Sequence, residues 1–248
     1  MHEDTRWKVI AAAGLVTLSL AMYLVHYAVF QDAHHLFIFL VGDLAFVPIE
    51  ILIVTLIVDQ MLESREKMRR MEKLNLVIGT FFSNEGTSLL ALLARADPQS
   101  VLIKGMLGEV GEWDTGRFLK IQKYTREHPG STDIDRINLY QLKQFLIEHE
   151  EFVLRIVENP MVFEHESFTS CILALGHLTE EIKAREDLKL LPGTDRAHLE
   201  RDINRVYTAL ICEWIRYMEY IHGQYPYLFS LAMRKNPFDE SASVVVME

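Results

Sequence analysis

A 23-residue apolar segment, Leu36 to Val58, constrains this chain more than any other feature of its sequence. Asp43 and Glu50 are its only charged residues. An α-helix rises about 1.5 Å per residue, so roughly 20 apolar residues cross the hydrocarbon core of a bilayer. A core helix of a soluble protein would usually be polar along one side, which this segment is not. We therefore expect residues 36–58 to form a membrane-spanning helix.

A second apolar segment, residues 9–30, contains no Asp, Glu, Lys or Arg. It exceeds the 7–15 apolar residues of a secretory signal, so we expect an uncleaved span that a tight turn joins to the next. Arg6 and Lys8 precede this span, and five basic residues follow the second span, whereas the turn has none. The positive-inside rule therefore predicts an inner (plasma) membrane protein with both termini in the cytoplasm.

The remainder of the chain is expected to be helical throughout. Pro and Gly clusters such as Leu191-Pro192-Gly193 separate the helical segments, and no stretch alternates as a sheet strand does. The predicted fold class is all-α, with a transmembrane hairpin whose second span continues into a cytoplasmic helical bundle. The predicted parts are the hairpin (1–58), a juxtamembrane helix (59–80), the helical domain (81–236) and a mobile tail (237–248).

Asp43 and Glu50 lie seven residues apart, which places them on the same helical face two turns apart. A charge in the middle of a span costs roughly 2.5–3.5 kcal/mol on insertion scales, so both acids require protein or water around them. Copies of the second span around an axis would let the acids line a cation path. Alternatively, the acids only hold a bundle together. His26 of the first span is a candidate partner for Asp43, either as a structural pair or as a proton or cation site.

Motifs for catalysis or cofactor binding are missing from the sequence. There is no Gly-rich phosphate loop, GxSxG, HExxH or CxxC. Cys171 and Cys212 lie in apolar helical patterns and are expected to be buried thiols. The net charge of −10 argues against nucleic acid as a partner. We therefore expect no cofactor.

Pairs of Glu and His in the helical domain offer weak candidates for a metal site. Glu219 and His222 have the Glu-x-x-His spacing of di-iron carboxylate bundles, and Glu181 follows His177 by four residues. Such a bundle requires a second Glu-x-x-His pair, which the sequence does not contain. We therefore expect most of these side chains to lie on a solvated surface, with no bound metal.

Three stretches together resemble an uncharacterised prokaryotic family of two-span inner-membrane proteins with a helical cytoplasmic domain. They are GDLAFVPIEILIVTLIVDQ (Gly42–Gln60), LNLVIGTFFSNEGTSLL (Leu74–Leu90) and YPYLFSLAMRKNPF (Tyr225–Phe238). The likeness covers most of the chain and implies this layout. It implies no activity and no site residue, because none is assigned to that family.

Three functions agree with these observations. Two spans per chain make a thin bundle, so the leading expectation is a homo-oligomer in the lipid bilayer that conducts cations under the control of its cytoplasmic domain. The first alternative is a membrane-anchored sensor or scaffold whose helical domain binds a protein or a small ligand. The second alternative is a metal-dependent enzyme in the helical bundle.

Overall fold

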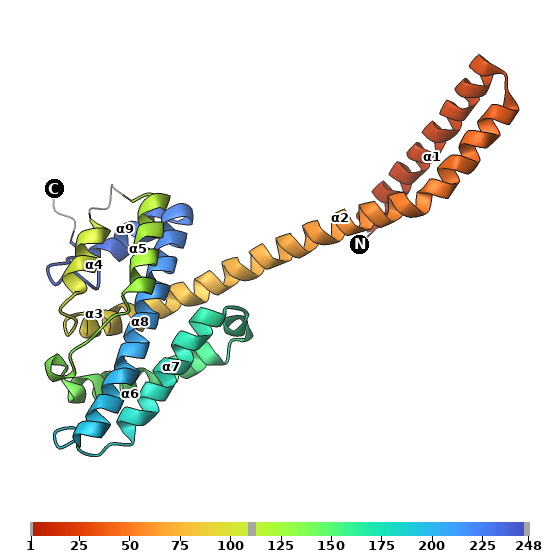
Figure 1. Ribbon diagram of the computed structural model, residues 1–248. Coiled ribbons are helices and arrows are strands. Elements are labelled where there is room, and N and C mark those ends of the chain that lie inside the picture. The colour runs from red at the N-terminus through yellow and green to blue at the C-terminus, as the bar shows by residue number, and fades with distance from the viewer. Residues whose placement is uncertain (1, 109–112, 246–248) are drawn as a thin grey trace. The chain divides into compact units, whose positions relative to one another are not determined.

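A computed structural model gives the structure of residues 2–108 and 113–245. Every regular element within these residues is a helix, so the all-α prediction is confirmed (Figure 1). The chain divides into two compact units, residues 1–66 and 67–248. The boundary between the units falls inside helix α2, which spans Ala33–Phe81.

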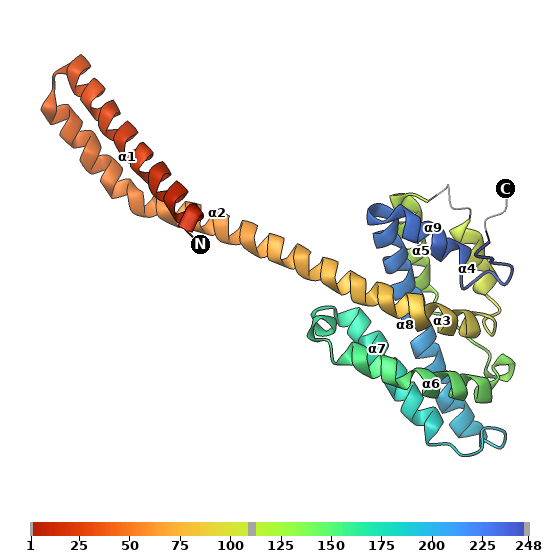
Figure 2. The same cartoon turned by 180° about the vertical axis from the view of Figure 1, so that it is seen from behind.

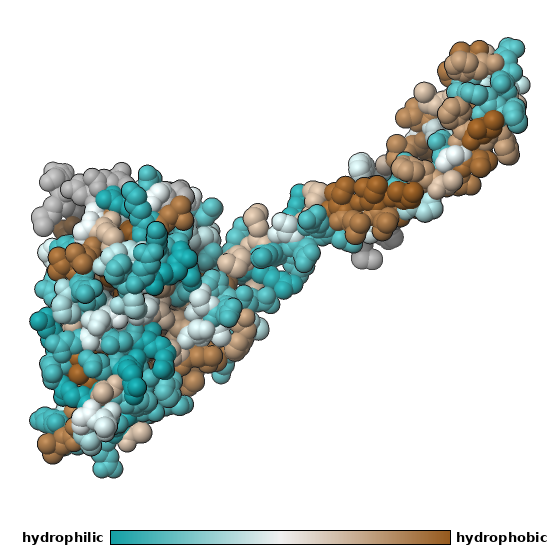
Figure 3. All heavy atoms as spheres, viewed as in Figure 1, coloured by the Kyte–Doolittle hydropathy of each residue, from teal (hydrophilic) through white to brown (hydrophobic). Residues whose placement is uncertain are grey.

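Helix α1 (His2–Phe30) and the first part of α2 form the N-terminal unit, where they run side by side in opposite directions (Figures 1 and 2). Both helices are long and apolar enough to cross a membrane, and no residue of the most apolar window of either is buried. Figure 3 shows hydrophobic side chains over this unit, whereas the visible face of the helical domain is mainly hydrophilic. The helix continues through Pro48.

The turn between α1 and α2 consists of residues 31–32, in agreement with the expected tight turn. Gln31 adopts a φ of 48°, which ends α1. Asp32 then caps α2, because its Oδ1 accepts hydrogen bonds from the backbone N–H groups of His34 and His35 at 3.0 and 3.1 Å. A side-chain oxygen at this position satisfies N–H groups that have no partner within the helix.

The second unit consists of helices joined by short connections. Its α-helices are α3 (Thr87–Ala94), α4 (Ser100–Leu107), α5 (Thr115–Glu127), α6 (Leu139–Val157), α7 (Glu166–Lys183), α8 (Gly193–Gln224) and α9 (Pro226–Arg234). In the described part of this unit, the chain also forms a π-helical turn, η1 (Phe82–Gly86), and the 3₁₀ turns η3 (Ile134–Arg136) and η4 (Pro160–Glu164).

Helix α8 is the centre of this unit and packs against α3, α5, α7 and α9. Its buried apolar residues recur every three or four positions, the spacing that places side chains on the same face of a helix. They include Val206, Leu210, Trp214, Met218 and Ile221. The turn at residues 191–193 precedes α8 as the Pro-Gly pair predicts.

Helix α2 ends in the π-helical turn η1. The backbone stays right-handed helical through Phe82–Gly86, and α3 follows directly. Gly86 makes this turn possible, because a Cβ there would lie 2.5 Å from Cε1 of Phe81 and 2.8 Å from Cδ1 of Phe82. Both rings are buried in the core of the domain.

The segment 237–248, expected to be a mobile tail, begins by packing on the domain. Phe238 is buried, and its ring lies edge-on to Trp214 at 5.7 Å between centroids. Asp239 accepts a 2.7 Å hydrogen bond from Lys104. The ordered fold therefore extends past Pro237, while residues 246–248 lie outside those described.

Replacing Gly86 by Ala should destabilise the protein by about 1–3 kcal/mol, because the added methyl group has no room between two buried rings. Gly176→Ala is the matched control, since a Cβ at this position of α7 meets no atom within 4 Å. That control should be neutral or slightly stabilising, because Ala is a better helix former than Gly. Thermal unfolding of both variants in detergent tests this expectation, and equal melting temperatures would contradict it.

Candidate functional site

Two of the three polar residues predicted to act in the membrane come together. His26 and Asp43 line one cavity of about 440 Å³ within the N-terminal unit. The Nε2 of His26 is buried and has no hydrogen-bond partner among the described residues. The His26 ring stacks on His35 at 6.0 Å between centroids. Glu50 does not line this cavity and is exposed on α2.

Glu219 and His222 each have other contacts in the helical domain. Glu219 Oε2 accepts a 2.7 Å hydrogen bond from Gln122 Nε2 of α5. The His222 ring packs on Phe118 and Phe229, at 5.6 and 4.8 Å between centroids. These contacts assign both side chains to the packing of α8 against α5 and α9.

The other weak pair, His177 and Glu181, lies beside a matching pair from α8. His198 and Asp202 have the same four-residue spacing and face them. Asp202 Oδ2 lies 3.6 Å from His177 Nε2 and 3.3 Å from His198 Nε2. Glu181 Oε1 lies 4.0 Å from His177 Nε2, and its Oε2 lies 3.7 Å from His198 Nε2. We call these four residues the His–carboxylate cluster.

Two arginines hold the carboxylates of the His–carboxylate cluster. Arg205 Nη1 lies 2.9 Å from Asp202 Oδ1. Arg185 Nη1 donates to Glu181 Oε2 at 2.7 Å, and Arg185 also contacts Asp195. The hydrogen bond from Arg185 lowers the pKa of Glu181, so this carboxylate is ionised at neutral pH.

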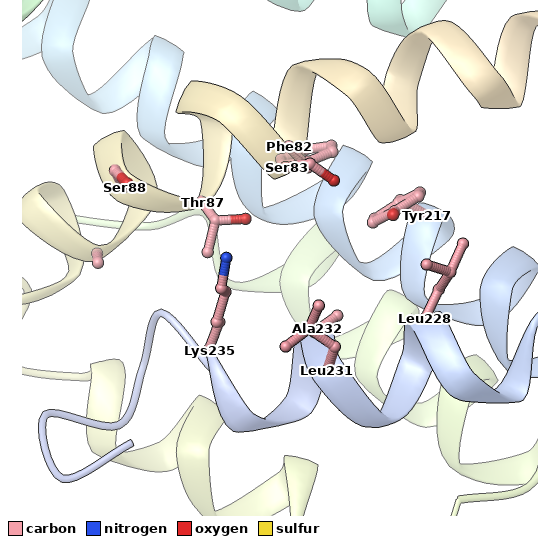
Figure 4. Close-up of a pocket in the computed structure, with 10 residues that line it drawn as sticks. Phe82, Ser83, Thr87, Ser88, Tyr217, Leu228, Leu231, Ala232 and Lys235 are labelled. Carbon is pink, nitrogen blue, oxygen red and sulfur yellow. The ribbon is translucent and has the colours of Figure 1, made fainter. Parts of the chain in front are cut away.

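A cavity of about 290 Å³ opens beside η1, between the start of α3, the C-terminal part of α8 and α9 (Figure 4). Its apolar wall includes Phe82, Leu228 and Leu231. The Tyr217 ring stacks on Phe82 at 5.6 Å between centroids and is largely buried. We call this space the η1 cavity.

Hydroxyl groups and one ammonium group supply the polar side of the η1 cavity. The hydroxyls belong to Ser83, Thr87, Ser88 and Tyr217. Figure 4 shows the Lys235 side chain reaching from the end of α9 toward Thr87. No acidic residue lines the cavity, and no ion pair of Lys235 occurs in residues 2–108 and 113–245. A positive charge among neutral hydroxyls favours an anionic ligand.

Glu85 is a buried acid within η1 itself. Its side chain is 7% exposed. Burial raises the pKa of Glu85 from 4.5 to about 7, although the charge of His149 opposes the shift. π-Helical turns often occur at functional sites, and a titrating buried acid is consistent with such a role.

We expect the free energy of unfolding to fall as pH rises from 4.5 to 7. Glu85 holds its proton over this range in the folded protein but loses it in the unfolded chain, so folding is linked to proton uptake. The loss should be on the order of 1–3 kcal/mol. Glu85→Gln should abolish this component of the pH dependence, whereas the control Glu180→Gln, at an exposed position of α7, should keep it. Melting curves at pH 5 and pH 8 measure the difference, and a wild-type profile in Glu85→Gln would contradict it.

Sequence reasoning missed His198, Asp202 and Lys235. The first two repeat the His-x-x-x-acid spacing of His177 and Glu181, which was the available signal. Lys235 had no such signal, because only folding of α9 beside η1 places it near the hydroxyl groups.

Comparison with known proteins places this chain in a family. Residues 2–62 match the N-terminal helical domain of MJ1433, and residues 70–234 match the C-terminal helical domain of uncharacterized protein MJ1433. The chain belongs to the MJ1433 family. It is 40% identical over 243 residues to the MJ1433 protein of Methanocaldococcus jannaschii, covering 98% of each chain. No solved structure matches it.

The membership agrees with the expected resemblance to an uncharacterised family, and the two family domains meet near the boundary between the two units of the structure. The family descriptions name no membrane, activity or ligand.

Proposed function

We propose that this protein is an oligomeric membrane-anchored sensor whose helical domain binds a small anionic ligand in the η1 cavity. The spans are α1 and the first part of α2, which expose apolar side chains along lengths sufficient to cross a bilayer. The distribution of Lys and Arg favours an inner membrane location with both termini in the cytoplasm.

The observation that carries the proposal is the lining of the η1 cavity. Lys235 supplies a charge without an acidic neighbour in the lining, four hydroxyls supply donors, and Phe82 and Tyr217 supply a flat apolar wall. Ligand sites typically combine apolar walls with a few convergent polar groups in this way.

The position of the η1 cavity on the chain favours a sensing role. Phe82 and Ser83 line the cavity and directly follow Phe81, the last residue of α2. Helix α2 also carries the second apolar segment. A ligand that changes the conformation of the π-helical turn thus acts on the C-terminal end of α2. The first part of the same helix carries the apolar segment that is proposed to cross the membrane.

Binding to the full-length protein in detergent tests the proposal. We expect at least one of three anionic probes, inorganic phosphate, succinate and a nucleoside monophosphate, to raise the melting temperature of the wild type. Lys235→Met should abolish the rise, because the variant removes the charge and keeps a similar side-chain length. Lys120→Met, at an exposed position on α5, is the control and should respond as the wild type does. An equal rise in all three proteins, or none in the wild type, would contradict the proposal.

A cation channel is the second candidate function. Asp43 and Glu50 are exposed on the otherwise apolar segment 36–58 of α2, so burial in lipid is unfavourable unless other copies of the chain cover them. His26 lines the same cavity as Asp43, so the N-terminal unit has a second polar side chain beside this acid. These observations favour an oligomer whose second spans face one another around a polar path.

Purified protein reconstituted in planar bilayers distinguishes the channel from a simple anchor. If the acids line the path, the double variant Asp43→Asn and Glu50→Gln should lose cation selectivity, because two negative charges per chain disappear from it. Glu63→Gln, outside the apolar segment, is the control and should conduct as the wild type does. Unchanged selectivity in the double variant would refute the pore, and a monomeric mass in nanodiscs would refute both the pore and the oligomer.

A further inference from the structure

We propose that His177, Glu181, His198 and Asp202 bind one divalent transition-metal ion between α7 and α8. Two imidazoles and two carboxylates are the donors that Zn²⁺ and related ions accept. This His–carboxylate cluster shares no lining residue with the η1 cavity, so the inference stands independently of the proposed sensor function.

The distances between the donor atoms fit a tetrahedral ion. Zinc bonds to nitrogen and oxygen are about 2.0–2.2 Å long, which places neighbouring ligand atoms of a tetrahedron about 3.3–3.5 Å apart. Asp202 Oδ2 lies 3.3 and 3.6 Å from the Nε2 atoms of His198 and His177, Glu181 Oε2 lies 3.7 Å from His198 Nε2, and the other Glu181 oxygen lies 4.0 Å from His177 Nε2. One donor atom from each of Glu181, His198 and Asp202 lies within 4.8 Å of the other two. Binding an ion therefore requires side-chain rotations that bring the donor atoms closer together.

Asp202 provides an independent sign of a ligand. Its side chain is 3% exposed, and its Oδ2 is buried without a hydrogen-bond partner among the described residues. A buried carboxylate oxygen that accepts no hydrogen bond carries a desolvation cost, so such groups usually have a bound partner. This oxygen is the one nearest to both imidazoles, at 3.3 and 3.6 Å. A metal ion held there would satisfy it.

Neighbouring arginines orient the two carboxylates of the His–carboxylate cluster before an ion binds. Arg205 contacts the opposite oxygen of Asp202, and Arg185 holds Glu181, so neither carboxylate is free to turn away. Outer partners of this kind orient metal ligands and support affinity. With neutral imidazoles, the two carboxylates contribute a charge of −2, which balances a divalent ion.

A network of ion pairs with protonated histidines is the competing explanation. It would hold α7 to α8 through the same four side chains, but it would strengthen as pH falls and histidine gains a proton. A metal site behaves in the opposite way, because protons compete with the ion for imidazole nitrogen. The two explanations therefore predict opposite effects of pH and different effects of added metal.

Titration of the untagged full-length protein with Co²⁺ and Zn²⁺ in detergent tests the site. We expect one Co²⁺ per chain with the visible absorption of tetrahedral cobalt, displaced by Zn²⁺ and weakened below pH 6. Losing an outer partner of a metal ligand costs 10–100-fold in affinity, so His198→Gln should weaken binding by at least about 100-fold. The double variant His177→Gln and His198→Gln should abolish it.

The variants are chosen so that misfolding does not obscure the result. The side chains of His177 and His198 are 45% and 43% exposed, so their replacement leaves no cavity in the core. Circular dichroism confirms folding. His128→Gln, at an exposed histidine that ends α5, is the control and should bind as the wild type does. Absence of binding in the wild type, equal affinity in the double variant, or loss of binding in His128→Gln would each overturn the proposal.

Discussion

The burial of α8 is the constraint on which the helical domain depends. This helix lies against α3, α5, α7 and α9, and its apolar residues are buried along most of its length. One polar group of α8 that enters this core is paired: Tyr207 donates its hydroxyl proton to Asp97 at 3.0 Å. Gly130 lets the chain pass close to the Tyr207 ring, where a Cβ would lie 2.5 Å from two ring carbons. The neighbouring helices therefore have one register against α8, and the side chains at its edges have defined positions.

Both candidate sites depend on the packing of α8 against its neighbours. Asp202 lies on the part of α8 that packs against α7, between the buried residues Leu199 and Ile203, and its Oδ2 faces the imidazoles. Tyr217 lies about four turns later on the same helix and stacks on Phe82 at the wall of the η1 cavity. A rigid helix thus presents an acid to one neighbour and a ring to another, as a precise binding group requires.

Helices could be predicted well where local chemistry decides them. Apolar length indicated α1 and α2, and the Pro-Gly turn at 192–193 indicated the start of α8. Prediction was less accurate where two residues could each cap the start of a helix. Asp133 and Asn138 both precede α6, but Asn138 accepts a hydrogen bond from the Gln141 N–H and starts α6, whereas Asp133 caps only the preceding 3₁₀ turn. Both residues are good caps, and the sequence pattern does not say which one begins the helix.

The sequence by itself determined the all-helical class and the two apolar segments, because helical periodicity and apolar length are local properties of the chain. Only the tertiary structure decided which polar groups meet. It brought His177 and Glu181 to His198 and Asp202, placed Lys235 beside the hydroxyls of η1, and assigned Glu219 to a hydrogen bond with Gln122. Each of these encounters joins residues from different helices, and their distance depends on the packing of whole helices against α8. The spacing of residues along the chain does not show which residues of one helix pack against which residues of another.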